Sequence, residues 1–220
     1  MRVAFSVLIV ALAAPQQAPE HGHGDRFGNP ANLDTYIANL EDPARDAWQK
    51  PDAVVKALGL APGQTACDIG AGPGYFALRL ARAVGPTGHV WAVDVEPVIL
   101  AALRDRVEKA GITNLTPLLA IARDPLLPPS ACDVVLIVNT YHHFHDGPDY
   151  LRRLARALKP GGRIVNVDYQ KKETPVGPPQ AHRISREEFL ADAGQAGLAR
   201  VAEPEILPYQ YVVVLEPRAN

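Results

Sequence analysis

A glycine-rich turn between a short apolar segment and a helix-forming segment constrains this chain more than any other feature. The turn is Asp68-Ile69-Gly70-Ala71-Gly72-Pro73-Gly74, and in residues 75–81 after it the apolar side chains recur at helical spacing. The glycines let the backbone turn tightly and let a ligand approach where a Cβ would block it. A helix that begins here directs its free N–H groups and positive dipole end at that ligand. The sequence therefore predicts a nucleotide-type pocket at the end of a buried strand.

The glycine spacing argues against a dinucleotide. A G-x-G-x-x-G fingerprint would place its third glycine at position 75, which is Tyr75. Asp68, before the turn, suits a ligand with a cationic amino group better than one with phosphates. The segment resembles the first motif, D/E-x-G-x-G-x-G, of the class I S-adenosylmethionine-dependent methyltransferases. Two alternatives stay open: a nicotinamide-dependent oxidoreductase on a similar sheet, and a non-catalytic protein that binds S-adenosylmethionine.

The order of the other segments agrees with this resemblance. The sequence LKPGGRIVNVDY, which follows YHHF, is a second point of similarity to the same methyltransferases. The resemblance covers roughly residues 35–216. It implies an α/β fold with a Rossmann-like, doubly wound sheet of seven strands, mostly parallel with an antiparallel last strand, and helices on both faces. Strands are expected at 88–94, 114–119, 133–138, 163–169, 198–206 and 209–215, and helices at 97–111, 150–158 and 185–196.

A second acidic residue fits the same ligand. Asp94 ends the second predicted strand, close to where nucleotide-binding α/β units place a carboxylate on a ribose diol, and the resemblance gives it that role. In the family, an acid often follows the third strand and binds the adenine amino group. Here that acid is missing or displaced to Asp124, and backbone groups around Ile121 are the alternative. The predicted cofactor-binding residues are Asp68, Gly70, Ala71, Gly72, Gly74, Asp94, Val95, Ala122 and Asn139, and the cofactor is S-adenosyl-L-methionine.

A polar cluster follows the most apolar predicted strand. Because ligands bind beyond the carboxyl ends of such strands, the residues after Val138 are expected at the mouth of the pocket. His142 and His143 are the candidate general bases, since imidazole titrates near neutrality, and Tyr141 is expected to orient the acceptor. One histidine of the pair can instead be structural, and His182 is a further possibility. We predict no metal site, although His142, His143, His145 and Asp146 form a ligand-type cluster.

Composition limits the partners. A chain of 220 residues is long enough for one well-packed α/β domain, and a net charge of −2 gives no electrostatic reason to expect nucleic-acid binding. A small-molecule substrate is therefore expected, and the oligomeric state stays open. Cys67 and Cys132 lie on strands that we expect to be parallel neighbours, with the sulfurs at different heights. We predict two buried thiols rather than a disulfide.

The amino-terminal residues predict export. Residues 1–13 combine a positive start, an apolar run and an A-x-A pattern, as in a secretory signal peptide too short to leave a stable membrane span. A misassigned start or a polar tail is the alternative, with a cytoplasmic protein as its consequence. Residues 14–32 are expected to be a flexible linker, and 33–220 the methyltransferase domain with a helical cap at 33–60. Export would separate the enzyme from S-adenosylmethionine, which is made in the cytoplasm.

Overall fold

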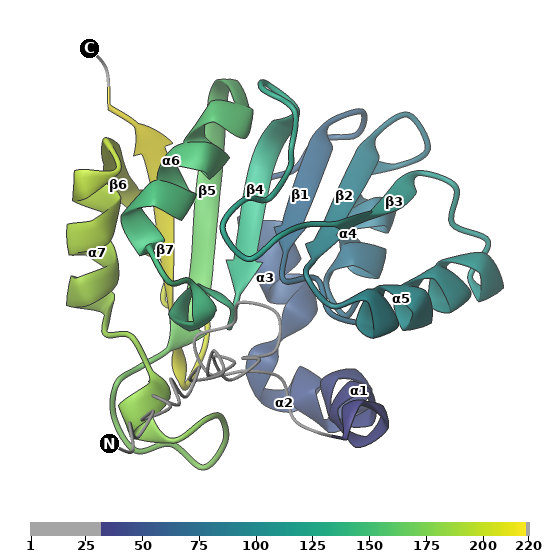
Figure 1. Cartoon of the computed structure of the whole chain (residues 1–220), viewed down its shortest axis with the longest axis horizontal. Helices are drawn as coiled ribbons and strands as arrows, with labels where there is room; N and C mark the ends of the chain where they lie inside the picture. Colours follow the sequence, from purple (N-terminus) through teal and green to yellow (C-terminus); the bar gives the residue numbers. More distant parts are fainter. Residues whose placement is uncertain (1–31, 219–220) are drawn as a thin grey trace, which may run out of the picture.

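The computed structural model describes residues 32–218, which form one seven-stranded sheet in the order β3-β2-β1-β4-β5-β7-β6 (Figure 1). Strands β1 to β5 pair in parallel, and β7 is antiparallel to both of its neighbours, β5 and β6. This confirms the predicted fold class. The strands are β1 (Thr65–Ile69), β2 (His89–Asp94), β3 (Leu115–Leu119), β4 (Cys132–Val138), β5 (Leu158–Tyr169), β6 (Leu198–Ala202) and β7 (Gln210–Pro217).

Helices cover both faces of the sheet, and each face has its own apolar core. The first core joins the sheet to α3, α4 and α5, and the second joins it to α6 and α7. Alternate residues of β4 divide between them: Val134 and Leu136 belong to the first core, and Val135 and Ile137 to the second. The helices are α1 (Leu33–Glu41), α2 (Asp46–Gln49), α3 (Pro51–Ala57), α4 (Ala77–Val84), α5 (Pro97–Lys109), α6 (Gly147–Ala157) and α7 (Arg186–Gln195), with short 3-10 turns η2 (Pro43–Arg45), η3 (Tyr141–His143) and η4 (Gln180–His182).

Helix ends follow local side-chain chemistry. The predicted capping box of α7 is confirmed: the Ser185 hydroxyl accepts from the Glu188 N–H, and the Glu188 carboxylate accepts from the Ser185 N–H. Helix α6 begins three residues earlier than predicted, because the Asp146 side chain caps it by accepting from the Asp149 N–H at 2.9 Å. These caps set the residues at which α6 and α7 begin.

The predicted helical region 33–60 is present but divided into α1, η2, α2 and α3. Its middle breaks at Lys50, which has a φ of 42° and joins α2 to α3. The predicted signal peptide 1–13 and nearly all of the predicted linker lie outside the described residues. Among residues 32–218, no helix is both long enough and apolar enough to cross a membrane.

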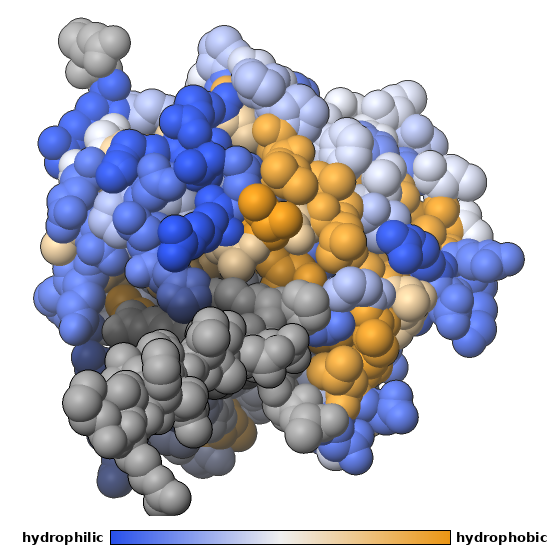
Figure 2. All heavy atoms as spheres, viewed as in Figure 1, coloured by the Kyte–Doolittle hydropathy of each residue, from blue (hydrophilic) through white to orange (hydrophobic). Residues whose placement is uncertain are grey.

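The connection from β3 to β4 crosses one face of the sheet and carries exposed apolar side chains. Figure 2 shows apolar residues gathered along this crossing in the same view as Figure 1. Ile121 and Leu126 are among the most exposed large apolar residues, whereas Leu127 and Ala131 pack against the second core. The crossing therefore lies against the sheet and brings residues 120–122 to the carboxyl ends of the strands.

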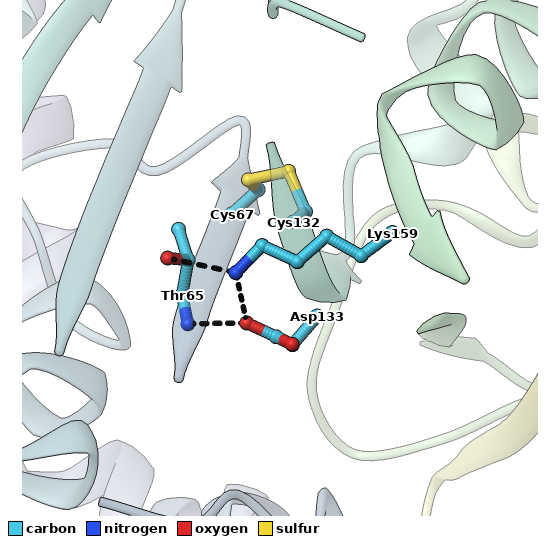
Figure 3. Close-up of a disulfide and its surroundings, with 5 residues drawn as sticks. All are labelled: Thr65, Cys67, Cys132, Asp133 and Lys159. Atoms are coloured by element: carbon cyan, nitrogen blue, oxygen red, sulfur yellow. Dashed lines mark hydrogen bonds and ion pairs between the residues drawn. A yellow bond between two sulfur atoms is a disulfide. The ribbon is translucent and has the colours of Figure 1, made fainter. Parts of the chain in front are cut away.

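Cys67 and Cys132 form a disulfide (Figure 3), so the prediction of two free thiols is wrong. The prediction assumed regular parallel pairing, which does place Cys67 opposite Val135. However, the pairing of β4 with β5 shifts between Cys132 and Val134, so β4 does not start as a regular strand. The Cα atoms of the two cysteines are 5.9 Å apart, within the range that a disulfide requires, and both residues are fully buried.

A polar network lies beside the disulfide and joins three strands. The Oδ2 atom of Asp133 accepts from the Thr65 N–H at 2.7 Å and from Lys159 Nζ at 2.6 Å (Figure 3). Burial raises the pKa of Asp133, but these hydrogen bonds outweigh burial, so that this pKa lies below its ordinary value. The disulfide and the network together hold β1, β4 and β5 in register.

Loss of the disulfide is expected to lower the free energy of unfolding by about 4 kcal/mol, because the bond constrains the unfolded chain over 65 residues. Urea unfolding of oxidised protein and of the Cys67→Ala/Cys132→Ala variant measures this difference. Reduced wild-type protein is the control, since it keeps both side chains. Two reactive thiols in unreduced, guanidinium-unfolded protein would contradict the bond itself.

Candidate functional site

A pocket lies at the carboxyl ends of β1, β2, β3 and β4, beneath the helical cap. The space between its walls and its open mouth is about 1050 Å³, solvent at the mouth included. The glycine turn forms its floor, and α1 and η2 contribute Tyr36, Leu40 and Arg45 from the cap. The site is therefore where a parallel α/β sheet places its ligand.

Most of the predicted cofactor-binding residues meet in this pocket. Gly74 is the exception: a Cβ at this position would collide with Leu103 of α5, so its small size serves helix packing rather than ligand access. Glycine is required at position 70 because the Thr140 side chain occupies the space of a Cβ. The φ of Gly70, 71°, also favours glycine. The predicted residues that line the pocket are Asp68, Gly70, Ala71, Gly72, Asp94, Val95, Ala122 and Asn139.

Asp94 connects the glycine turn to the end of β2. Its Oδ2 atom accepts from the Gly72 N–H at 2.9 Å, and its Oδ1 atom accepts from the Glu96 N–H at 3.0 Å. Burial raises the pKa of Asp94, while these hydrogen bonds oppose the shift. Each oxygen keeps a lone pair for a further donor, so that the carboxylate can accept two vicinal hydroxyls.

Asp68 is a buried carboxylate with an open position. It is 2% exposed, and its Oδ2 atom accepts no hydrogen bond within the described part of the chain. Burial, and then repulsion from Asp94, raise the pKa of Asp68 to about 7. A buried carboxylate oxygen without a hydrogen-bond donor destabilises the folded state unless a ligand supplies the donor. An ammonium group would satisfy both its hydrogen bond and its charge.

The part of the pocket where the sequence predicts an adenine contact lacks the expected acid. Asp124, the displaced acid, does not line the pocket; its Oδ2 atom pairs with Arg153 Nη1 at 2.6 Å. Ala120 and Ala122 line that part of the pocket instead. Specific recognition of an adenine there would use backbone groups, which is the alternative that the sequence had left open.

The histidine pair separates into two environments. His143 lines the pocket, and its ring lies 4.2 Å from that of His142. His142 is buried, with Nδ1 3.2 Å from Oδ2 of the fully buried Asp168 on β5. Tyr141 donates its hydroxyl to Asp192 of α7 at 2.7 Å and does not line the pocket. The geometry therefore favours His143 as the candidate base, with His142 and Asp168 behind it.

The other predicted polar residues lie away from the pocket. His182 is in η4 and is not a lining residue; His145 is exposed, and Asp146 caps α6. Throughout residues 32–218, no group of three or more histidine, cysteine, aspartate or glutamate side chains is arranged to hold a metal ion.

Sequence reasoning did not assign several residues that shape the site. Gln210 of β7 donates its Nε2 to Oδ1 of Asn139 at 2.6 Å and so holds a lining residue whose φ is 52°. Arg45 packs its guanidinium 4.1 Å from the centre of the Tyr75 ring, and burial lowers the pKa of Arg45. Asp168, which contacts His142, was also not assigned from the sequence. All of them act across long sequence separations, for which a single sequence carries no spacing signal.

The long loop after β5 is held beside the cap by a buried arginine. Arg183 is 4% exposed and donates to the backbone carbonyls of Gln170 at 3.0 Å and Lys172 at 2.7 Å. Its guanidinium also lies 5.0 Å from the ring centre of Tyr169, which in turn contacts the Trp48 ring of α2 at 5.8 Å. Cap and loop therefore meet across the carboxyl edge of the sheet.

Comparisons with known proteins agree with this geometry. A family model described as a methyltransferase domain matches residues 66–162. Over 123 residues the chain is 32% identical to the ubiquinone/menaquinone biosynthesis C-methyltransferase UbiE of Ectopseudomonas mendocina, covering 56% of this chain and 48% of that protein. Identity to the UbiE of Vibrio vulnificus is 32% over 114 residues, covering 51% of this chain and 44% of that one. The chain thus spans about half the length of the curated relatives it matches.

A solved structure matches over a longer stretch. The crystal structure of a SAM-dependent methyltransferase from Aquifex aeolicus superposes with a TM-score of 0.79 at 29% identity, covering 82% of this chain and 96% of that one. The glycine turn, the strand order with its antiparallel β7, and the two pocket carboxylates all fit the same assignment. Residues 66–162 match a methyltransferase domain, and the chain has the fold of the class I S-adenosylmethionine-dependent methyltransferases.

Proposed function

We propose that this protein transfers a methyl group from S-adenosylmethionine to a small-molecule acceptor. The observation that carries the proposal is one pocket that combines Asp68, Asp94 and the glycine turn with His143. Asp68 would hold the ammonium of the donor and Asp94 its ribose hydroxyls. A negative net charge gives no support to a nucleic-acid acceptor.

Methyl transfer requires the protein mainly to position the donor and the acceptor. Bound S-adenosylmethionine would supply a methyl group already activated by its sulfonium. The cap and the post-β4 segment would exclude water and hold the acceptor in line with the bond that breaks. As the acceptor bonds to the methyl carbon, the electron pair of the broken bond stays on sulfur. His143 would take any proton that the acceptor loses.

The lining favours an apolar or aromatic acceptor. Tyr36 and Leu40 of the cap and Phe144 after η3 give the pocket apolar walls. The relatives above are named as C-methyltransferases of ubiquinone and menaquinone biosynthesis, whose names point to acceptors of this kind. We extend to this chain only the chemical class, an apolar ring compound.

We also propose that the protein is exported. The amino-terminal leader pattern supports export, and so does the Cys67–Cys132 disulfide, since such bonds persist in oxidising compartments. Fractionation of bacteria that express the full chain, with and without residues 1–13, tests this proposal. Finding both forms in the cytoplasm would reject export.

S-adenosylhomocysteine is expected to bind, and Asp94→Asn is expected to weaken binding about 10- to 100-fold, because a carboxylate that accepts two hydroxyls is lost. Calorimetry measures the affinity, and a thermal-shift screen against NAD separates this function from the oxidoreductase alternative. Asp124→Asn is the matched control, since Asp124 lies outside the pocket. Stabilisation by NAD but not by S-adenosylhomocysteine would overturn the proposal.

Affinity for S-adenosylhomocysteine is expected to rise about tenfold between about pH 6 and pH 8. Asp68, with a pKa of about 7, is mostly protonated at the lower pH, and only its ionised form attracts an ammonium, so affinity increases with pH. Calorimetry across this range gives the slope. 5′-Methylthioadenosine, which lacks the amino-acid part, and the Asp68→Asn variant should both show no rise; an equal rise in all cases would refute the assignment.

His143→Gln is expected to lower methyl transfer about 100-fold or more while leaving S-adenosylhomocysteine affinity within about threefold, because the base acts on the acceptor. The measurement is incorporation of labelled methyl into a small-molecule extract. His145→Gln is the control, since His145 is exposed in the same segment. Equal incorporation by wild type and His143→Gln would remove His143 as the base.

A further inference from the structure

The pocket is lined by both negative and positive side chains, which a ligand with a positive and a negative group would pair. The lining contains two carboxylates, Asp68 and Asp94, and, as the one arginine or lysine among the described lining residues, Arg45. The donor and its thioether product carry an ammonium, a ribose diol and a carboxylate. The two acids account for the ammonium and the diol, and the carboxylate needs a cation.

Arg45 is held rigidly but keeps donors available. Its Nε and Nη2 atoms donate to Oε1 of Gln49 at 3.0 and 2.7 Å, and its Nη1 donates to the Leu40 carbonyl. Gln49 is fully buried, and the guanidinium stacks on the Tyr75 ring. A guanidinium has five N–H donors, so that two remain for a ligand.

No carboxylate among the described residues neutralises the charge of Arg45. No ion pair joins it to a carboxylate within residues 32–218, and the side chains whose charges act on its pKa are Tyr75, Tyr169, Tyr36 and Arg79. A partly buried cation without a counter-ion is costly, and a bidentate carboxylate is its best partner.

Arg79 gives a comparison within the same cluster. It also packs over the Tyr75 ring, at 4.5 Å, but it pairs with Asp46 at 3.1 Å and with Asp52 at 3.5 Å. It does not line the pocket. Two arginines therefore share one aromatic ring, and the one that lines the pocket, Arg45, has no carboxylate partner in the part of the chain that the structure describes.

We propose that Arg45 binds the carboxylate of the methyl donor, so that the helical cap recognises the donor's amino-acid end together with Asp68. Arg45 and Asp68 then form a pair that selects a zwitterion. This inference rests on the proposed function. The other source of an anion is the acceptor, and the experiment below separates the two.

The test varies the protein and the ligand together. Calorimetry with the full chain compares S-adenosylhomocysteine with its decarboxylated form, which keeps the ammonium and loses only the carboxylate. Wild type should bind the decarboxylated ligand about 10- to 100-fold more weakly. Arg45→Gln should lose a similar factor for S-adenosylhomocysteine and should no longer distinguish the two ligands. Arg45→Lys should recover part of the discrimination, and Arg79→Gln should keep it.

Each other outcome has a definite reading. Equal affinity of wild type for the two ligands overturns the role of Arg45 without any variant and leaves the proposed function standing. If Arg45→Gln weakens the binding of both ligands by the same factor, the role of Arg45 is also overturned. An unchanged affinity for S-adenosylhomocysteine in Arg45→Gln overturns it too, and would assign Arg45 to an anionic acceptor. If wild type binds neither ligand, the proposed function itself fails.

Discussion

Two buried carboxylates repel each other at the carboxyl edge of this sheet, and the architecture around them makes that arrangement possible. Asp68 lies one residue before the end of the central strand β1, opposite Ala92 of the parallel neighbour β2, and Asp94 ends β2 two residues further on. The Gly72 N–H donates to Asp94, whereas one oxygen of Asp68 has no donor within residues 32–218. A buried carboxylate without a donor destabilises the fold, and a bound ligand that supplies a donor and a positive charge would offset this cost.

The sequence predicted the fold and the floor of the site because both depend on local signals. The glycine turn, the apolar run of β4 and the Ser185 capping box each specify structure over a few residues. The parallel sheet then brings strand ends together by topology, which is why Asp68, Asp94 and Asn139 could be assigned to one pocket.

What the sequence could not predict depends on contacts between distant segments. The cysteine pairing was missed because an irregular start of β4 is invisible in the residue pattern. Gly74 fits the family motif, yet it packs against Leu103. Arg45 and Gln210 come from the cap and the last strand, and neither stands near a motif. Tyr141 is adjacent to the histidine pair in sequence, but its hydroxyl reaches α7 instead of the ligand space.

The most direct measurement is a crystal structure of the protein with S-adenosylhomocysteine bound. The account predicts the ammonium within hydrogen-bond distance of Asp68 Oδ2, the ribose hydroxyls on Asp94, and the amino-acid portion above the glycine turn. A ligand bound elsewhere, or bound in this pocket with Asp68 still lacking a donor, would contradict it.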